Sequence, residues 1–348
     1  MLPKRVLSVG GTSASPSVVL IETNYLRGHY TTLSHCWGPI EKQPLRTTKD
    51  TLASHLNGIP FKSLPKSFQD VVIVTRAIGL DYLWIDSLCI VQEDEIEWAE
   101  ESLKMGSIYE RSRLTIAAAD AENSSQGCFI WERRPRVSLH GMLLKPTVPW
   151  FYTGPIASPL RRREWALQEW QLSRRIAFFT DEGVWWKCKR IELDPWNQRT
   201  NLQQYSSWSS ILQRYSECQL TYKSDRLTAL DGLATEMQKD REDQYHLGIW
   251  TANLPEHLLW TSRLVTPADD DIPELPSWSW ASRGGNKVFW STQYYDWRRE
   301  VSSNKISILQ NVLTIQGSLK RCTVKYTDAI PWDKYPGTWK RLPLRRFS

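Results

Sequence analysis

The chain has 348 residues, of which 41% are hydrophobic and 24% are charged, a balance that suits a folded globular protein of two or three domains. Its formal net charge is +6, but the 44 basic and 38 acidic residues are interspersed, which argues against a surface built for nucleic acid. No segment reaches the length of a membrane-spanning helix, and the apolar run 18–21 is too short for a signal-peptide core, so we expect a cytoplasmic protein.

The first 120 residues alternate between segments typical of strands and segments typical of helices. Apolar residues recur on one helical face from 67 to 78 and stop at Gly79, whereas "YLWIDSLCIV" is almost continuously apolar, as in a strand buried on both faces of a parallel sheet. In chain order we expect strands at 18–23 and 29–38, a helix at 67–78, a strand at 82–91, a helix ending at Tyr109 and a strand at 113–119.

The segment 120–159 is rich in Pro, Gly, Ser and Arg and is expected to be a long loop. A helix at 164–173 and strands at 175–180 and 183–188 should follow, then helices within 206–239 and antiparallel strands from 276 onward. This order predicts an α/β fold with a doubly wound, mostly parallel sheet over residues 1–190, and a mixed helical and antiparallel β region, rich in Trp, over 191–348.

Four phrases resemble the fungal heterokaryon incompatibility (HET) domain family. They are "YTTLSHCWG", "LPKSFQDVVIVTRAIGLDYLWIDSLCIVQ", "WAEESLKMGSIYERSRLTIAA" and "RRREWALQEWQLSRR", in the family's order between residues 30 and 175. The resemblance implies a cytoplasmic protein of non-self recognition that triggers programmed cell death. HET domains also look like remote relatives of TIR domains, which have a flavodoxin-like sheet and of which some cleave NAD with one helix-borne glutamate; this second step is an analogy of fold.

Glu101 occupies a position where a packed helix is expected to carry an apolar side chain. Trp98, Glu101, Met105 and Ile108 follow at steps of three, four and three, the spacing of a buried stripe. One interpretation makes Glu101 the catalytic carboxylate, which would stabilise positive charge on the ribose as nicotinamide departs. The alternative is that it is one of several acids near the start of the helix, where the helix dipole favours negative charge.

The loop "SHCWG" and the apolar run around Asp86 supply the candidate ligand contacts. We expect Ser34, Trp37 and Gly38 to bind the ligand, with Trp37 stacking on a base or nicotinamide ring; simple turn and core packing is the alternative. An unpaired Asp86 inside an apolar strand would cost several kcal/mol, so it should have a partner such as an arginine or backbone amides, or lie at the mouth of a cleft.

Other polar residues have structural interpretations. Adjacent residues of a strand face opposite sides, so His35 should not activate Ser34 or Cys36 as a nucleophile. Gln168 and Glu169 share a helical face with Trp165 and should form a buried hydrogen-bond network. The six cysteines are at least 30 residues apart with no CxxC pair, which predicts reduced thiols and no metal site.

Two functional hypotheses follow from different classes. The first is an incompatibility effector that binds a nucleotide and cleaves the glycosidic bond of NAD, which would be its substrate and not a bound cofactor. The second is a non-enzymatic signalling module that triggers cell death by self-association or by binding partner proteins. Neither hypothesis involves a membrane or nucleic acid.

Overall fold

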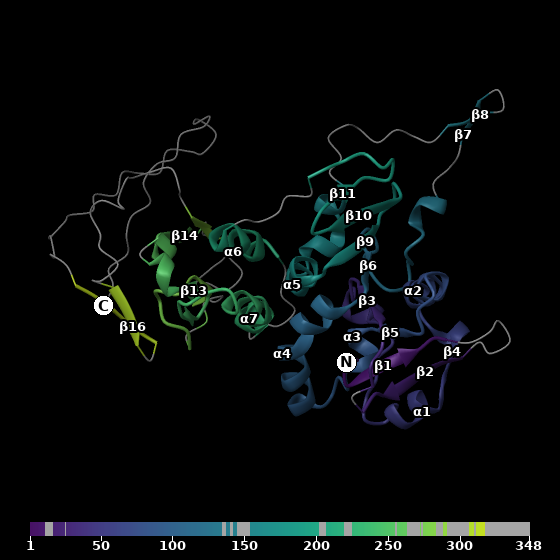
Figure 1. The fold of residues 1–348 in the computed structure, drawn as a ribbon, viewed down its shortest axis with the longest axis horizontal. Helices are drawn as coiled ribbons and strands as arrows, with labels where there is room; N and C mark the ends of the chain where they lie inside the picture. The colour runs from purple at the N-terminus through teal and green to yellow at the C-terminus, as the bar shows by residue number, and fades with distance from the viewer. Residues whose placement is uncertain are drawn as a thin grey trace.

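A nine-stranded mixed sheet forms the centre of the N-terminal region (Figure 1). The computed structural model describes residues 1–10, 17–24, 26–133, 137–139, 142–144, 154–201, 207–218, 225–254, 256–262, 272, 274–282, 288–290, 306–309 and 311–316. In spatial order the sheet consists of β11 (Glu192–Leu193), β10 (Val184–Cys188), β9 (Arg175–Phe179), β6 (Leu114–Ala118), β3 (Tyr30–Ser34), β5 (Tyr82–Trp84), β1 (Arg5–Ser8), β2 (Ser17–Glu22) and β4 (Ile59–Pro60).

The sheet is parallel only in its centre. β3 pairs in parallel with β5 and β6, and β6 pairs in parallel with β9, whereas the strands on both flanks are antiparallel. The expected α/β fold is therefore confirmed, but its sheet is mixed, with only the central strands parallel. The difference has a physical reason: β1 pairs with β2, and β9 with β10, across connections too short for the crossover that parallel strands need.

Helices cover both faces of this parallel core. Tyr30 and Thr31 are neighbours in β3 and point in opposite directions: the Tyr30 hydroxyl donates to the Ile108 carbonyl at 2.7 Å, and Thr31 Oγ1 lies 2.7 Å from Thr75 Oγ1. Ile108 belongs to α4 (Glu95–Arg111) and Thr75 to α2 (Lys66–Ala77). α5 (Glu164–Leu172) packs against α4, on the side of the sheet opposite α2 (Figure 1). All three helices lie where their periodicity predicts them.

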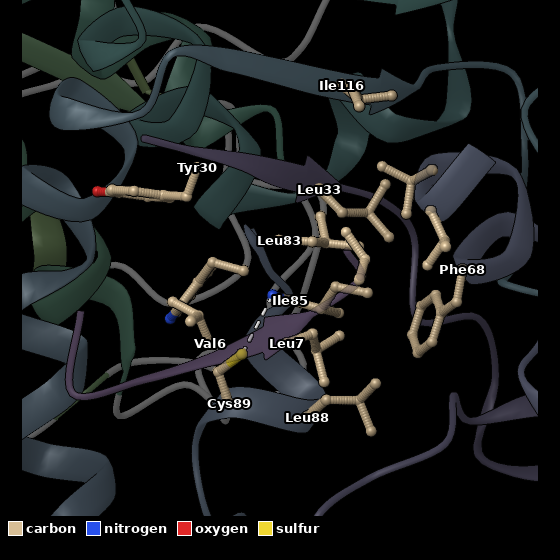
Figure 2. Packing of buried hydrophobic residues seen from close by; sticks show 14 of the residues in the cluster. Val6, Leu7, Tyr30, Leu33, Phe68, Leu83, Ile85, Leu88, Cys89 and Ile116 are labelled. Carbon is tan, nitrogen blue, oxygen red and sulfur yellow. Dashed lines mark hydrogen bonds between the residues drawn. The ribbon is translucent and has the colours of Figure 1, made fainter. Parts of the chain in front are cut away.

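The apolar run 82–91 is not one strand, which corrects the sequence-based expectation. β5 ends at Trp84, and α3 (Asp86–Cys89) begins two residues later. The Ile85 carbonyl accepts the Cys89 amide at 2.8 Å, which closes the first helical turn. Figure 2 shows Leu88 and Cys89 packed beside β1, so the apolar character of this run reflects burial of a helical turn.

Three hydrophobic clusters organise the described chain, of which the smallest packs Leu160, Phe178 and Trp185 together. The first lies on both sides of the sheet and includes Leu7, Leu33, Phe68 and Leu83 (Figure 2). The second surrounds Trp250 and Trp280 between α6 (Trp208–Ser216) and α7 (Asp225–Gln238), and α7 packs against α4 and α5. The tryptophans thus supply much of the buried area of the C-terminal region.

The remaining elements are short. The C-terminal strands β14–β15 and β16–β17 pair antiparallel, as expected. The segment 276–282, where a strand is expected, holds a 3-10 turn instead, and 317–327 lies outside the described residues. Among the described residues, no helix is both long and apolar enough to cross a membrane. The short elements are α1 (Leu52–Asn57), β7 (Val137–Leu139), β8 (Met142–Leu144), β12 (Tyr245–His246), β13 (Ile249–Trp250), β14 (Trp260–Ser262), β15 (Val288–Trp290), β16 (Ile306–Leu309), β17 (Val312–Ile315) and the 3-10 helices η1 (Ile40–Lys42), η2 (Phe61–Ser63), η3 (Ile130–Arg133), η4 (Gly154–Ala157), η5 (Pro159–Arg162), η6 (Thr251–Asn253), η7 (Glu256–Leu258) and η9 (Trp280–Ser282).

Candidate functional site

The strand order reverses at β3, and polar residues converge at that point. The chain passes from β3 to its parallel neighbour β5 on one side, and then returns to place β6 on the other side of β3. In open α/β sheets, ligands bind outside the carboxyl ends of the strands where this reversal occurs. Residues 34–37 end or follow β3, and Asp86 follows β5 after one residue. These two segments form what we call the edge site.

Asp86 is the centre of the edge site. Its Oδ2 accepts the Trp37 indole N–H at 2.9 Å, and its Oδ1 accepts the Ser87 amide at 2.8 Å. The Arg163 guanidinium lies 3.9 Å from Oδ2, and His35 Nδ1 lies 3.9 Å from Oδ1. With a side chain only 9% exposed, Asp86 needs these partners, as the sequence predicted. Trp37 and Asp86, two of the predicted ligand contacts, are thus in direct contact.

Arg163 reaches the edge site from the start of α5. Its guanidinium donates to the His35 carbonyl and lies 5.9 Å from the centre of the Trp37 ring, while its side chain stays 22% exposed. Burial alone would lower its pKa, but Glu169 and Asp86 outweigh that effect and raise it. A fixed arginine beside a half-buried indole is a suitable contact for an anionic ligand with a ring.

Ser34 and Glu169 lie beneath the edge site, on the α5 side of the sheet. The fully buried Ser34 hydroxyl donates to Glu169 Oε2, so Ser34 points at a protein carboxylate. Burial raises the pKa of Glu169 to about 7, against the opposing effects of Arg163 and Ser34. The nearby Tyr109 hydroxyl donates to the Leu33 carbonyl at 2.9 Å. The expected buried network is confirmed only for Glu169, because neither side-chain polar atom of Gln168 has a hydrogen-bond partner among the described residues. A ligand contact by Ser34 stays a prediction.

His35 faces α2, opposite to Ser34. Its ring packs edge-on against Phe68, with ring centres 5.2 Å apart, and neither ring nitrogen has a hydrogen-bond partner in the described part of the chain. Burial lowers the pKa of His35 to about 4, with Asp86 opposing, so the ring is neutral at pH 7. The expected alternation of Ser34 and His35 is confirmed, and this geometry does not make His35 a base for Ser34.

The cysteines near the edge site are poor nucleophiles. Burial raises the pKa of the Cys36 thiol to about 11 and that of the Cys89 thiol to about 12, with smaller effects from nearby charges. Since the thiolate is the reactive form, neither side chain is activated. All five described cysteines are free, and Cys322 lies outside the described residues. The described residues contain no group of His, Cys, Asp and Glu that could hold a metal ion.

Gly38 shapes the turn that follows β3. It has a φ of +81°, in the left-handed region that favours glycine. A Cβ at this position would lie 2.7 Å from the Asn123 Cβ, so the β3 loop and the loop after β6 approach closely here. Gly38 therefore positions Trp37 by allowing this approach, and its predicted ligand contact stays a prediction.

Glu101 is buried, as its place in the apolar stripe predicted, and its carboxylate pairs with a lysine of the same helix. It is 2% exposed, and its Oε1 accepts the Lys104 amine at 2.8 Å. Among the described residues, no hydrogen bond or ion pair joins Glu101 to Ser34, Trp37 or Asp86. Its catalytic role therefore stays a prediction, and no hydrogen bond or ion pair among the described residues links it to the edge site.

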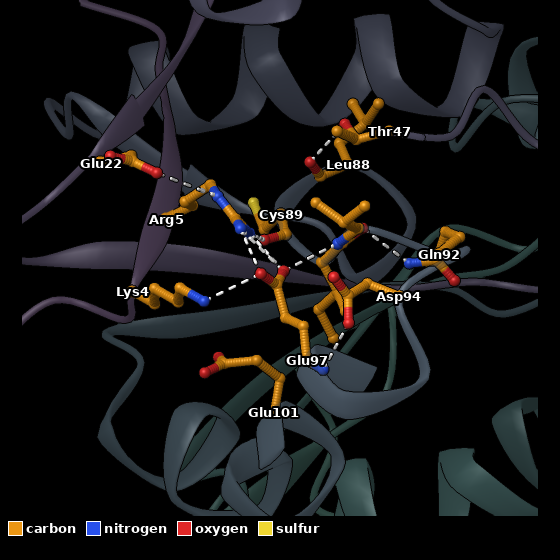
Figure 3. A network of polar contacts seen from close by, with 12 residues as sticks. Lys4, Arg5, Glu22, Thr47, Leu88, Cys89, Gln92, Asp94, Glu97 and Glu101 are labelled. Atoms are coloured by element: carbon orange, nitrogen blue, oxygen red, sulfur yellow. Dashed lines mark hydrogen bonds and ion pairs between the residues drawn. The ribbon is translucent and has the colours of Figure 1, made fainter. Parts of the chain in front are cut away.

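Glu97, one turn earlier in α4, has a structural role that the sequence analysis missed (Figure 3). Its carboxylate accepts hydrogen bonds from both terminal nitrogens of the buried Arg5, and those from Nη2 measure 2.8 and 2.6 Å. It also accepts from the Lys4 amine at 2.8 Å and from the Val91 amide at 3.0 Å. The Asp94 side chain caps the same helix by accepting the Glu97 amide at 3.0 Å. An arginine inside the apolar segment "RVLS" was the signal that a buried partner must exist.

These features define an α/β domain with a candidate ligand site at the carboxyl edge of its parallel strands. A family model described as "Heterokaryon incompatibility protein (HET)" matches residues 30–169, from the first residue of β3 to Glu169. The chain therefore carries a HET domain over these residues, and the resemblance of its motifs is confirmed. A HET domain implies a role in heterokaryon incompatibility and cell death. No curated protein and no solved structure matches the chain.

Proposed function

We propose that this chain is a cell-death effector of heterokaryon incompatibility whose HET domain binds a nucleotide, NAD, at the edge site and cleaves its glycosidic bond. The observation that carries the proposal is the convergence of Trp37, Asp86 and Arg163 where the strand order reverses. The indole suits a base or nicotinamide ring, and the guanidinium suits a phosphate.

The proposed reaction needs one carboxylate near the ribose. The bond between the ribose carbon and the nicotinamide nitrogen breaks with its electron pair going to nicotinamide, and water then adds to the positively charged ribose and releases a proton. A fixed carboxylate stabilises that charge. We assign this role to Glu101. In the structure, Glu101 forms an ion pair with Lys104, whose side chain is 54% exposed. Such a pair contributes at most about 1 kcal/mol, so the positively charged ribose can displace the lysine.

Asp86 is the rival carboxylate for the same role. It already lies within the edge site, 9% exposed and in contact with Trp37, whereas Glu101 would have to be reached by the ribose from that site. Asp86 is held by four neighbouring groups, which makes it better suited to positioning Trp37 and Arg163 than to following a moving charge.

Nicotinamide release by the purified full chain tests the proposal. We expect wild type to release nicotinamide from NAD and Glu101→Gln, nearly the same shape but unable to offset positive charge, to lose that activity. Glu100→Gln, an exposed neighbour on the same helix, is the matched control and should retain it. If Glu101→Gln releases nicotinamide at the wild-type rate, the catalytic carboxylate would be Asp86 and not Glu101. No release by wild type, dilute or concentrated, would refute the enzyme.

The second candidate function is a non-enzymatic assembly module, favoured by the outer face of α4. Ile96 is 75% exposed and Leu103 is 62% exposed, and their spacing of seven places them on one side of the helix. In this function the pairing of Glu101 with Lys104 would be structural. Light scattering on wild type and an Ile96→Ser, Leu103→Ser variant tests it: self-association should weaken in the variant, and equal association by both proteins would contradict it.

A further inference from the structure

Two residues of the α5 segment are held by consecutive residues where β3 ends. Arg163, which precedes α5, donates to the His35 carbonyl. Glu169, inside α5, accepts a hydrogen bond from the Ser34 hydroxyl. Glu169 is 1% exposed, whereas the Arg163 side chain is 22% exposed. A buried carboxyl group is therefore fixed to the same strand end that holds the arginine of the edge site.

Two carboxyl groups act on Arg163. Its guanidinium lies 3.9 Å from Asp86 Oδ2. Burial lowers the pKa of Arg163, and the charge of Glu169 raises it more than the charge of Asp86 does. An anionic ligand at Arg163 would meet two negative charges if both carboxyl groups were ionised, but only one if Glu169 held a proton. The protonation of Glu169 thus affects how strongly the edge site attracts an anion.

The surroundings of Glu169 suit a neutral carboxyl group. Its Oε2 accepts from Ser34, and its buried Oε1 has no hydrogen-bond partner among the described residues. The nearby Tyr109 hydroxyl donates its single proton to the Leu33 carbonyl at 2.9 Å. A buried carboxylate needs several donors, whereas a protonated carboxyl group is buried at a lower cost.

We propose that Glu169 is a positioning residue of the edge site, which holds a proton when an anionic ligand binds and so leaves Arg163 to the ligand and to Asp86. Nucleotide binding at the edge site, as proposed above, is the basis of this inference, and cleavage is not required. Burial raises the pKa of Glu169 to about 7. Because the protonated form binds the anion better, affinity is full below that pKa and declines as pH rises through it.

The charged and titratable groups that act on Glu169 come from the end of β3 and from three helices. They are Cys36 after β3, Asp86 in α3, Tyr109 in α4 and Arg163 at the start of α5. Burial raises the pKa of Cys36 to about 11 and that of Tyr109 well above its usual value, so both stay neutral near pH 7. A proton taken up near pH 7 is therefore expected on Glu169.

Calorimetric titration of the full chain with adenosine diphosphate ribose tests this role, because the probe has the pyrophosphate but no nicotinamide to release. Two buffers with different heats of ionisation give the number of protons taken up on binding. We expect wild type to take up about half a proton per ligand at pH 7, and its affinity to fall about tenfold from pH 6 to pH 8.

Glu169→Gln should take up no proton and keep the same affinity from pH 6 to pH 8. A purely structural role would instead weaken binding equally at every pH. Glu122→Gln is the matched control, because this acid is exposed and its charge also acts on Cys36, and it should keep the wild-type pH profile. Circular dichroism confirms that the variants are folded.

Ser34→Ala provides a second measurement. The Ser34 hydroxyl lowers the pKa of Glu169, so its loss should shift the fall in affinity to higher pH. Binding by wild type without proton uptake would overturn the proposal, as would equal uptake by wild type and Glu169→Gln. No binding at millimolar probe would refute both this role and nucleotide binding at the edge site. Binding of the probe without nicotinamide release from NAD would refute the cleavage alone.

Discussion

The Trp37 indole N–H donates to Asp86 Oδ2 at 2.9 Å and thereby ties the loop after β3 to the first residue of α3. This bond connects the two segments that form the edge site. Because Asp86 is only 9% exposed, the bond also supplies one of the partners that make burial of its charge tolerable.

We predict that Trp37→Phe lowers the free energy of unfolding by about 1–3 kcal/mol, because it keeps the ring but removes the donor to a buried carboxylate. Chemical denaturation measures the change. Trp196→Phe is the control: this tryptophan is 65% exposed, and its replacement should stay within about 0.5 kcal/mol of wild type. Equal effects of the two substitutions would show that the bond to Asp86 contributes little.

Glu169 should make stability depend on pH in a direction unusual for a carboxyl group. Burial raises its folded pKa to about 7, above the unfolded value, so the stabilisation is complete below about pH 4.5 and is lost as pH rises to about 7. Glu169→Gln stays neutral. We expect the unfolding free energy of the variant minus that of wild type to increase over this range by up to about 3 kcal/mol and then level off.

The comparison of two proteins is necessary because other groups titrate in the same range. Burial lowers the pKa of both His35 and His257 to about 4, so each makes the protein more stable as pH rises from about 4 to 6.5. Burial also raises the pKa of Asp231 to about 6, with the opposite effect. Neither His257 nor Asp231 is among the groups that shift the pKa of Glu169, so their contributions to stability cancel in the difference. If the difference in unfolding free energy between variant and wild type stays constant from pH 4.5 to 7, the pKa of the buried Glu169 carboxyl is not raised.

Glu97→Gln should destabilise the fold by about 3 kcal/mol, the lower end for breaking a buried ion pair, because the 3% exposed Arg5 would lose its closest charged partner and keep only Glu22, at 3.8 Å. The lower end applies because the Glu97 side chain is 12% exposed. Glu100→Gln, on the exposed side of the same helix, should change the unfolding free energy by less than about 0.5 kcal/mol. If both variants lose a similar amount of unfolding free energy, the effect comes from the charge on the helix and not from the ion pair of Glu97 with Arg5.

Gly232→Ala tests the contact of α7 with α5. Alanine normally stabilises a helix by about 1 kcal/mol relative to glycine. Here a Cβ would lie 1.7 Å from Gln168 Nε2, and we expect destabilisation by about 1–3 kcal/mol from overpacking. Because the clash is with one side chain, Gln168→Ala should remove most of the cost in the double variant, which thermal unfolding can measure. Additive effects of the two substitutions would contradict this contact.

Local pattern was sufficient for much of the framework. Helical periodicity predicted α2 and α5 within one residue at each end, and the end of α4 within two residues, since each helix buries one face against the sheet. It failed at 82–91, because a continuous apolar run does not distinguish a buried strand from a strand followed by a buried helical turn. It also missed β1, a four-residue strand that is recognisable only through its pairing with β2 and β5.

The sequence by itself determined that this chain has an α/β HET domain, that Glu101 faces inward and that Asp86 needs partners, because periodicity and the cost of burying charge are local properties. Only the tertiary structure decided which partners meet. Arg163 reaches Asp86, Ser34 reaches Glu169 and Arg5 reaches Glu97 across long stretches of chain, because the strand order brings them together. No spacing along a sequence specifies such contacts, since they depend on how the elements pack.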